Sequence, residues 1–261
     1  MKKTRADYCY ADPAGNITIL VETAFPAADY PEIASRLLAA EPGAEQVGFI
    51  EGLSPGGVSL RMAGGEFCGN AALSSAAYAA MKAGANEGVF TVDFHGIERR
   101  LSAPVKRTSQ NSFSGKIEMP LPEKICERQL SFRGTDFCLP VVRFPGITHI
   151  ICTAPMEKAF AEAALKQWCA ELEAPAAGIM LVDQEKKELT PLVYVTRPET
   201  LFWESSCASG TCAAAAWLSS RSGKYGSFSF AEPGGRLGAE TGQDRLSLIN
   251  SVTLSLRSAE I

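Results

Sequence analysis

Hydrophobic residues recur along the chain in the order strand, helix, strand, helix, and this order appears twice. An apolar segment follows a Pro/Gly turn near residue 17 and again near residue 147, which predicts a strand at each place. Amphipathic stretches at 30–40 and 157–172 have apolar residues at helical spacing and predict one helix in each half. Alternating segments predict further strands at 89–97 and 227–235, each ending in a turn, and at 115–119, 192–195 and 251–255.

Two Ala-rich segments, at 68–77 and 207–216, carry the internal repeat most clearly. Each begins with a cysteine, and the two cysteines lie 139 positions apart, about half of the 261-residue chain. Recurrence of strands and helices at one offset indicates a duplicated architecture. We therefore expect an α+β protein of two similar, pseudo-symmetric domains with antiparallel or mixed sheets.

A polar stretch at 128–137, close to Pro120, Pro122 and Gly134, is the expected boundary between the halves. It divides the chain into an N-terminal domain at 1–130 and a C-terminal domain at 131–261. At about 150 residues per domain, the chain length accommodates two small domains.

Composition and charge exclude several classes of function. The net charge of −4, with no run of Lys or Arg longer than two, is not that of a nucleic-acid-binding protein. No window approaches the ~18 apolar residues of a membrane span, and no signal peptide is evident, so a cytoplasmic protein is expected. The eight cysteines form no CxxC pair and the two histidines lie far apart, which predicts reduced thiols and no metal site.

The two cysteines that begin the Ala-rich segments, Cys68 and Cys207, are candidate catalytic residues. A helix N-terminus has unpaired N–H groups and partial positive charge, which bind a carboxylate and favour a thiolate. We expect the two helix starts to meet at a cleft between the domains, with one sulfur on each face of a bound α-carbon. One thiolate would remove a proton while the opposite thiol returns one, without any cofactor. A single buried cysteine is more often a small core residue, but matched positions in a repeat favour catalysis.

The segments 13–16, 66–70, 204–211 and 232–235, together with the strand around His149, resemble the diaminopimelate epimerase superfamily of cofactor-independent, two-cysteine epimerases and racemases. The segments 45–51, 66–71 and 203–207 are most similar to the histidine racemases of opine-type metallophore synthesis. The resemblance covers nearly the whole chain. It implies two domains, each a barrel-like sheet around a central helix, with residues 252–261 completing the first domain.

The resemblance also implies the substrate. Diaminopimelate epimerases have a Glu-Arg-Gly segment whose arginine holds a distal carboxylate, whereas Arg197 is out of register here, so a neutral or cationic side chain is favoured. Glu45, Glu204 and Glu51 could accept a hydrogen bond from an imidazole or an ammonium group. Phe49, Phe202 or Trp203 could stack on a flat ring. The expected substrate-binding residues are Asn16, Glu45, Gly69, Asn70, His149, Glu204, Ser209, Gly210 and Thr211.

Three functions remain open at this point. The leading one is histidine racemisation, and the second is epimerisation of diaminopimelate or another amino acid on the same scaffold. The third is a non-racemising isomerase or metabolite-binding protein of the phenazine type, against which the two cysteines argue. For Glu45 the alternative is a solvated loop acid, and for His149 a structural histidine. The expected partners are an amino acid substrate and a second copy of the chain in a homodimer.

Overall fold

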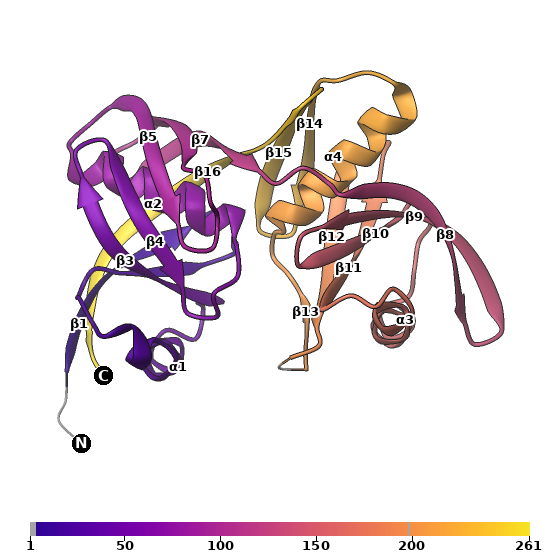
Figure 1. Cartoon of the computed structure of the whole chain (residues 1–261), viewed down its shortest axis with the longest axis horizontal. Helices are drawn as coiled ribbons and strands as arrows, with labels where there is room; N and C mark the ends of the chain where they lie inside the picture. Colours follow the sequence, from indigo (N-terminus) through magenta and orange to yellow (C-terminus); the bar gives the residue numbers. More distant parts are fainter. Residues whose placement is uncertain (1–3, 198) are drawn as a thin grey trace. The chain divides into compact units, whose positions relative to one another are not determined.

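The computed structural model describes residues 4–197 and 199–261, and it is a mixed α+β protein (Figure 1). The chain forms two compact units. Unit 1 comprises Met1–Glu118 and Ile249–Ile261, and unit 2 comprises Met119–Leu248. In the part of the chain that is described, no helix is both long and apolar enough to cross a membrane.

Unit 1 is a closed eight-stranded barrel with a helix inside it. Its strand order is β1-β2-β3-β4-β5-β6-β7-β16, and β1 also pairs with β16, which closes the barrel. The strands are β1 (Arg5–Asp12), β2 (Thr18–Val21), β3 (Gln46–Ser54), β4 (Gly57–Met62), β5 (Glu87–Phe94), β6 (Leu101–Arg107), β7 (Ser112–Met119) and β16 (Arg245–Glu260). Between β2 and β3 lie η1 (Ala27–Asp29) and α1 (Tyr30–Ala40), and α2 (Gly69–Lys82) lies between β4 and β5.

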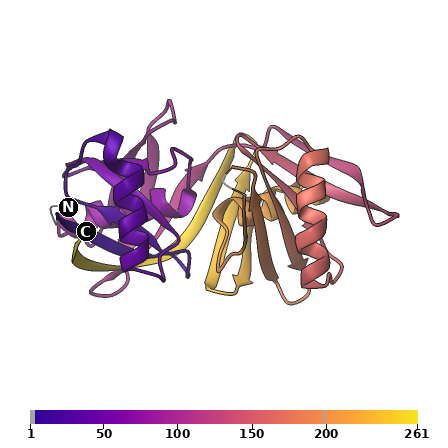
Figure 2. The ribbon, with the colours of Figure 1, turned by 90° about the horizontal axis from the view of Figure 1, so that it is seen from below.

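The central helix α2 packs against strands β1 to β6. Every residue from Gly69 to Ala80 is buried, and most of them are Ala, Ser or Gly. Small side chains on all sides allow a helix to be enclosed by strands. The amphipathic α1 instead lies on the outside of the strands (Figure 2). Its Ile33 and Leu37 join a core cluster with Phe49.

The strands of unit 2 continue the same hydrogen-bonded path from β16, in the order β16-β15-β14-β12-β11-β10-β9-β8, with β13 paired to β12. Helix α4 of unit 2 is buried along most of its length and packs against β9, β10, β11, β14 and β15. Trp168 on α3 is fully buried in a separate core cluster, which α3 forms with residues of β8, β10, β11 and β12. The elements are β8 (Lys124–Phe132), β9 (Thr135–Phe144), β10 (Ile147–Cys152), α3 (Lys158–Glu171), β11 (Ala176–Asp183), β12 (Glu188–Val195), β13 (Thr200–Trp203), α4 (Ala208–Ser222), β14 (Ser227–Glu232) and β15 (Gly235–Gly242).

The predicted helices are confirmed. The helix expected at 30–40 is α1, and that expected at 157–172 is α3 with Glu157 as its N-cap. The two cysteine-led segments are α2 and α4. The alternating segments at 115–119, 192–195 and 251–255 lie within strands, and those at 89–97 and 227–235 begin in β5 and β14 and continue into a turn, as expected.

The domain boundaries differ from those expected. Residues 128–137 are not a linker, because they form the end of β8, a turn and the start of β9. Arg133 and Gly134 have φ values of 49° and 77°, so Gly134 marks a hairpin turn. The units instead divide between Glu118 and Met119. Residues 252–261 belong to unit 1 as expected, within a returning segment that begins at Ile249, and β16 pairs with β1 from Thr253 to Glu260 to complete the barrel.

Candidate functional site

Cys68 is the N-cap of α2 and is half-buried. Its extended backbone, φ −127° and ψ 116°, turns the sulfur toward the first helical turn, where Ala71 N donates to Sγ at 3.4 Å. Gln46 Nε2 donates to the same sulfur at 3.2 Å. Both donors stabilise negative charge on the sulfur.

Four amide side chains, those of Gln46, Asn16, Asn70 and Asn250, form a network beside Cys68 in unit 1. Gln46 Nε2 and Asn70 Nδ2 both donate to Asn16 Oδ1, at 2.7 and 3.3 Å. Asn250 Nδ2 donates to Asn70 Oδ1 at 3.2 Å. The exposed Glu45 accepts from Asn16 Nδ2 at 2.5 Å. The structure therefore brings the candidates Asn16, Glu45 and Asn70 together, close to the helix start that contains Gly69.

The turn before β2 places Asn16. Gly15 N donates to Asp12 Oδ1 at 2.6 Å, and Ala14 and Gly15 have φ values of 61° and 84°. Glycine adopts such a conformation without the steric cost that a side chain adds. The short turn explains why the Pro/Gly signal precedes a candidate polar residue.

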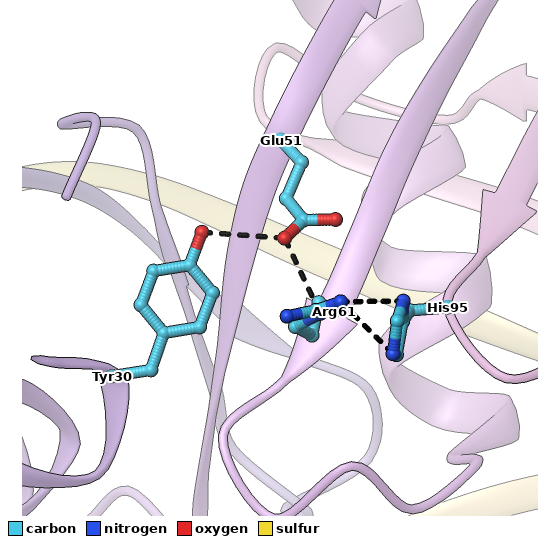
Figure 3. A network of polar contacts seen from close by, with 4 residues as sticks. All are labelled: Tyr30, Glu51, Arg61 and His95. Atoms are coloured by element: carbon cyan, nitrogen blue, oxygen red, sulfur yellow. Dashed lines mark hydrogen bonds and ion pairs between the residues drawn. The ribbon is translucent and has the colours of Figure 1, made fainter. Parts of the chain in front are cut away.

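Glu51 lies in a different network of unit 1, which Figure 3 shows from close by. Its carboxylate lies 3.3 Å from Arg61 Nε and accepts from the Tyr30 hydroxyl at 3.4 Å. Arg61 Nη2 also contacts the ring nitrogens of His95, at 2.8 and 2.9 Å. These contacts engage the Glu51 carboxylate with Arg61 and Tyr30 rather than with the residues around Cys68.

The aromatic residues considered for stacking on the substrate are engaged elsewhere or exposed. Phe49 is buried and stacks on Tyr30 with ring centroids 3.7 Å apart. Trp203 donates its indole N–H to Glu162 at 2.7 Å, and Phe202 is exposed.

In unit 2, Cys207 is the N-cap of α4 and has nearly the same backbone as Cys68, with φ −127° and ψ 106°. It is buried, and its Sγ lies 3.6 Å from Ser209 Oγ. Burial raises the pKa of the Cys207 thiol well above its usual range, and the carboxyl groups of Glu204 and Glu232 add to the increase. Cys207 is therefore a protonated thiol at neutral pH, in contact with the half-buried Glu204.

His149 on β10 is fully buried beside this helix start. Its Nε2 lies 2.9 Å from Ser209 Oγ, while Nδ1 has no hydrogen-bond partner among the described residues. Burial lowers the pKa of His149 to about 3, so the imidazole is neutral at physiological pH. The structure supports a structural or positioning role for the ring, because it reaches Ser209 and is closed off from solvent.

The two units share one arrangement. In each unit, a cysteine begins the central helix, and the residue two positions later makes a hydrogen-bond contact. Its partner lies in or next to a strand that follows a Pro/Gly turn. Asn70 contacts Asn16 in unit 1, and Ser209 contacts His149 in unit 2. The repeat is thus preserved in position, with amides in one unit and a hydroxyl and imidazole in the other.

Gly210 and Thr211 have packing roles in α4. A Cβ at Gly210 would come within 2.1 Å of Met180 Sδ and within 3.2 Å of Cys207 Sγ. The Thr211 hydroxyl is fully buried and contacts Cys207 O and Glu232 Oε1. Packing within the fold therefore accounts for glycine at position 210 and threonine at position 211 without a bound ligand.

We expect Gly210→Ala to destabilise unit 2 by about 1–3 kcal/mol, although alanine is the better helix former. The buried Met180 must move to admit the new methyl group. Urea unfolding followed by tryptophan fluorescence measures this, since all three tryptophans lie in unit 2. Gly226→Ala is the matched control, because a Cβ there meets nothing within 4 Å. Equal stability of the two variants would contradict the packing argument.

Three residues near these helix starts were not among the expected site residues. Gln46 contacts Cys68, Glu232 contacts the backbone of Cys207, and Asn250 joins Asn70. Gln46 and Glu232 lie in segments that carry the family resemblance, which was the available signal. Asn250 lacks a local signal, since its contact joins residues 180 positions apart.

Comparison with known proteins identifies the family. The profile described as "Histidine racemase CntK N-terminal domain" matches residues 5–255. The chain belongs to the histidine racemase family. It is 33% identical to a histidine racemase of Fusobacterium nucleatum over 222 residues, 81% of each protein. It is 25% identical to the histidine racemase of Staphylococcus aureus over 250 residues, 91% of this chain and 89% of that one. Membership of the histidine racemase family makes the protein an isomerase.

Solved structures similar to this histidine racemase family member share its fold. A predicted epimerase from Pseudomonas aeruginosa superposes with a TM-score of 0.69 at 15% identity, covering 98% of this chain and 99% of that one. A phenazine biosynthesis protein of the PhzF family from Enterococcus faecalis has a TM-score of 0.65 at 15% identity, over 99% of this chain and 100% of that one. At these identities the likeness concerns the fold alone.

Proposed function

We propose that the protein is a histidine racemase that inverts the α-carbon with two thiols and no cofactor. One observation carries the proposal: Cys68 and Cys207 occupy the same N-cap position, with the same backbone conformation, on the buried central helices of the two units. Membership of the histidine racemase family supports the substrate. The resemblance to diaminopimelate epimerases supports the two-thiol mechanism. The D-histidine formed would enter opine-type metallophore synthesis.

Inversion requires two thiols that reach opposite faces of one α-carbon. The thiolate form of one cysteine takes the α-proton, and the thiol of the other gives its proton to the opposite face. The configuration at the α-carbon is inverted and the two cysteines exchange protonation states, so the enzyme and substrate together gain or lose no proton. N–H groups at the two helix starts stabilise the negative charge that develops toward the substrate carboxylate.

The environments of the two sulfurs support a division of labour in the resting enzyme. Cys68 Sγ receives hydrogen bonds from Gln46 and Ala71, which favour a charged sulfur. Cys207 is buried next to Glu204, which favours the neutral thiol. In this proposal Cys68 is the first base and Cys207 the first acid, and the reverse reaction uses the opposite assignment.

Histidine is favoured over diaminopimelate by the charged side chains among the candidate residues of the two units. Arg197, the arginine closest in sequence to the Glu-Arg-Gly position, is exposed. A buried distal carboxylate without an arginine partner would cost several kcal/mol. Glu204 and Glu45 can instead accept hydrogen bonds from an imidazole or ammonium group.

Hydrogen exchange at the α-carbon tests this proposal. Enzyme free of pyridoxal phosphate is incubated in D2O with L-histidine, D-histidine or diaminopimelate, and deuterium is followed by NMR. We expect incorporation into both histidine enantiomers and none into diaminopimelate. Exchange into diaminopimelate alone would favour the epimerase alternative and overturn the substrate assignment. Absence of exchange into any amino acid would favour a non-racemising isomerase.

A further inference from the structure

The carboxyl group of Glu232, at the end of β14, lies behind Cys207 and is 7% exposed. Its Oε2 accepts from the backbone N–H of Cys207 at 2.8 Å. Its Oε1 contacts the Thr211 hydroxyl. The following turn is also attached here, since Gly234 N donates to Ser205 O at 2.7 Å. The Glu232 turn thus fixes the backbone on which Cys207 begins α4.

Counting hydrogens assigns a proton to Glu232. The Thr211 hydroxyl lies 2.8 Å from Cys207 O, four residues earlier in the helix, and also contacts Glu232 Oε1. A hydroxyl has one hydrogen and can donate fully to only one of these oxygens. Threonine within a helix commonly donates to the carbonyl four residues before it. The contact between Thr211 and Glu232 then needs a second hydrogen, and a protonated carboxyl group supplies it.

We propose that Glu232 is a positioning residue held as a neutral carboxylic acid, which anchors the Cys207 backbone without placing another negative charge beside the thiol. The carboxyl O–H donates to Thr211, Thr211 donates to Cys207 O, and Cys207 N–H donates to the second carboxyl oxygen. This ring of three hydrogen bonds leaves no buried polar atom of the group unpaired. The inference rests on the proposed function only in giving Cys207 a catalytic role.

The surroundings of Glu232 agree with the neutral form. The titratable groups that face it are Glu204, Cys207 and Cys212, so no cation among the described residues opposes a negative charge on Glu232. Burial raises the pKa of Glu232 to about 8, and Glu204 adds to the increase. Glu232 is therefore neutral at pH 7 and ionises above pH 8, where its charge disfavours the Cys207 thiolate.

Glu232→Gln is the decisive variant, because a glutamine amide reproduces both hydrogen bonds of the neutral acid and cannot ionise. Infrared spectra of the wild-type protein at pH 7 are expected to contain a protonated-carboxyl band that disappears above pH 8 and is missing in the variant. If the variant shows the same protonated-carboxyl band as the wild type, the neutral assignment is overturned. If the variant fails to fold, the wild-type titration decides alone: no carboxyl group titrating above pH 6 would also overturn it.

Alkylation of the two cysteines by iodoacetamide, read by peptide mass spectrometry, tests the effect on the thiol. At pH 9 we expect Cys207 to react roughly three- to tenfold faster in Glu232→Gln than in the wild type, with equal rates at pH 7. Cys68 is the internal control and reacts equally in both proteins. Faster alkylation of Cys207 in the variant already at pH 7 would mean that Glu232 is a carboxylate at that pH. Equal alkylation rates at pH 9 would mean that Glu232 does not influence the Cys207 thiol. Neither readout involves turnover, so they fail independently of the racemase assignment.

Discussion

Replacing either Cys68 or Cys207 by alanine is expected to abolish racemisation. Each inversion needs an acid and a base on opposite faces, so the remaining thiol cannot complete it. General acid–base groups contribute typically 10²–10⁴-fold to rate, and we expect a loss of at least about 10³-fold in either variant. Optical rotation of L-histidine, followed to equilibrium without added cofactor, measures the loss.

Matched variants separate catalysis from the mere loss of a thiol. Cys138 is exposed on β9, and Cys138→Ser is expected to retain wild-type activity. Both alanine variants should remain folded, because each removes one sulfur from a helix start whose backbone hydrogen bonds persist. A single alanine variant that keeps more than a few per cent of wild-type turnover would contradict the two-thiol mechanism.

Acidification is expected to destabilise unit 2 through His149. In an unfolded chain a histidine takes up a proton near pH 6.5, whereas burial lowers the pKa of His149 in the fold to about 3. Between these values the unfolded chain binds more protons than the folded one, so stability is lost as pH falls from 6.5 toward 3. At 1.4 kcal/mol per pKa unit, His149 accounts for a loss of roughly 2–3 kcal/mol between pH 7 and 4.5.

Urea unfolding of the wild type and His149→Gln, followed by tryptophan fluorescence at each pH, measures this contribution. Glutamine can still reach Ser209 but does not titrate, so the variant should lose less stability on acidification. His95→Gln is the control for removing a histidine, since His95 is exposed and lies beside Arg61. If the free energy of unfolding falls equally with pH in the wild type and in His149→Gln, the buried imidazole does not cause the loss of stability in acid.

The central helices and their cysteines were predictable because their signals are local. Apolar spacing located α1 and α3 almost to the residue, and the Ala-rich repeats located α2 and α4 with a cysteine at each N-cap. Small residues on all faces also account for the burial of these two helices. Helix formation and capping depend on neighbours within one or two turns, which the sequence displays directly.

Strand pairing decided what the sequence left open. The linker expected at 128–137 became the β8–β9 hairpin, and β16 returned to close the barrel of unit 1 by pairing with β1. Prolines and glycines mark turns but do not say whether the flanking segments pair with each other or separate. The domain boundary depended on that choice.

By itself, the sequence determined the duplicated α+β plan, the positions of the two thiols and the family resemblance. Only the tertiary structure identified the groups that contact them: Gln46 on Cys68, Glu232 behind Cys207, and the buried ring of His149 beside Ser209. These contacts join residues between 22 and 60 positions apart. They exist because β3, β10 and β14 pack around the helix starts, and both packing and the resulting desolvation of charge depend on the whole fold.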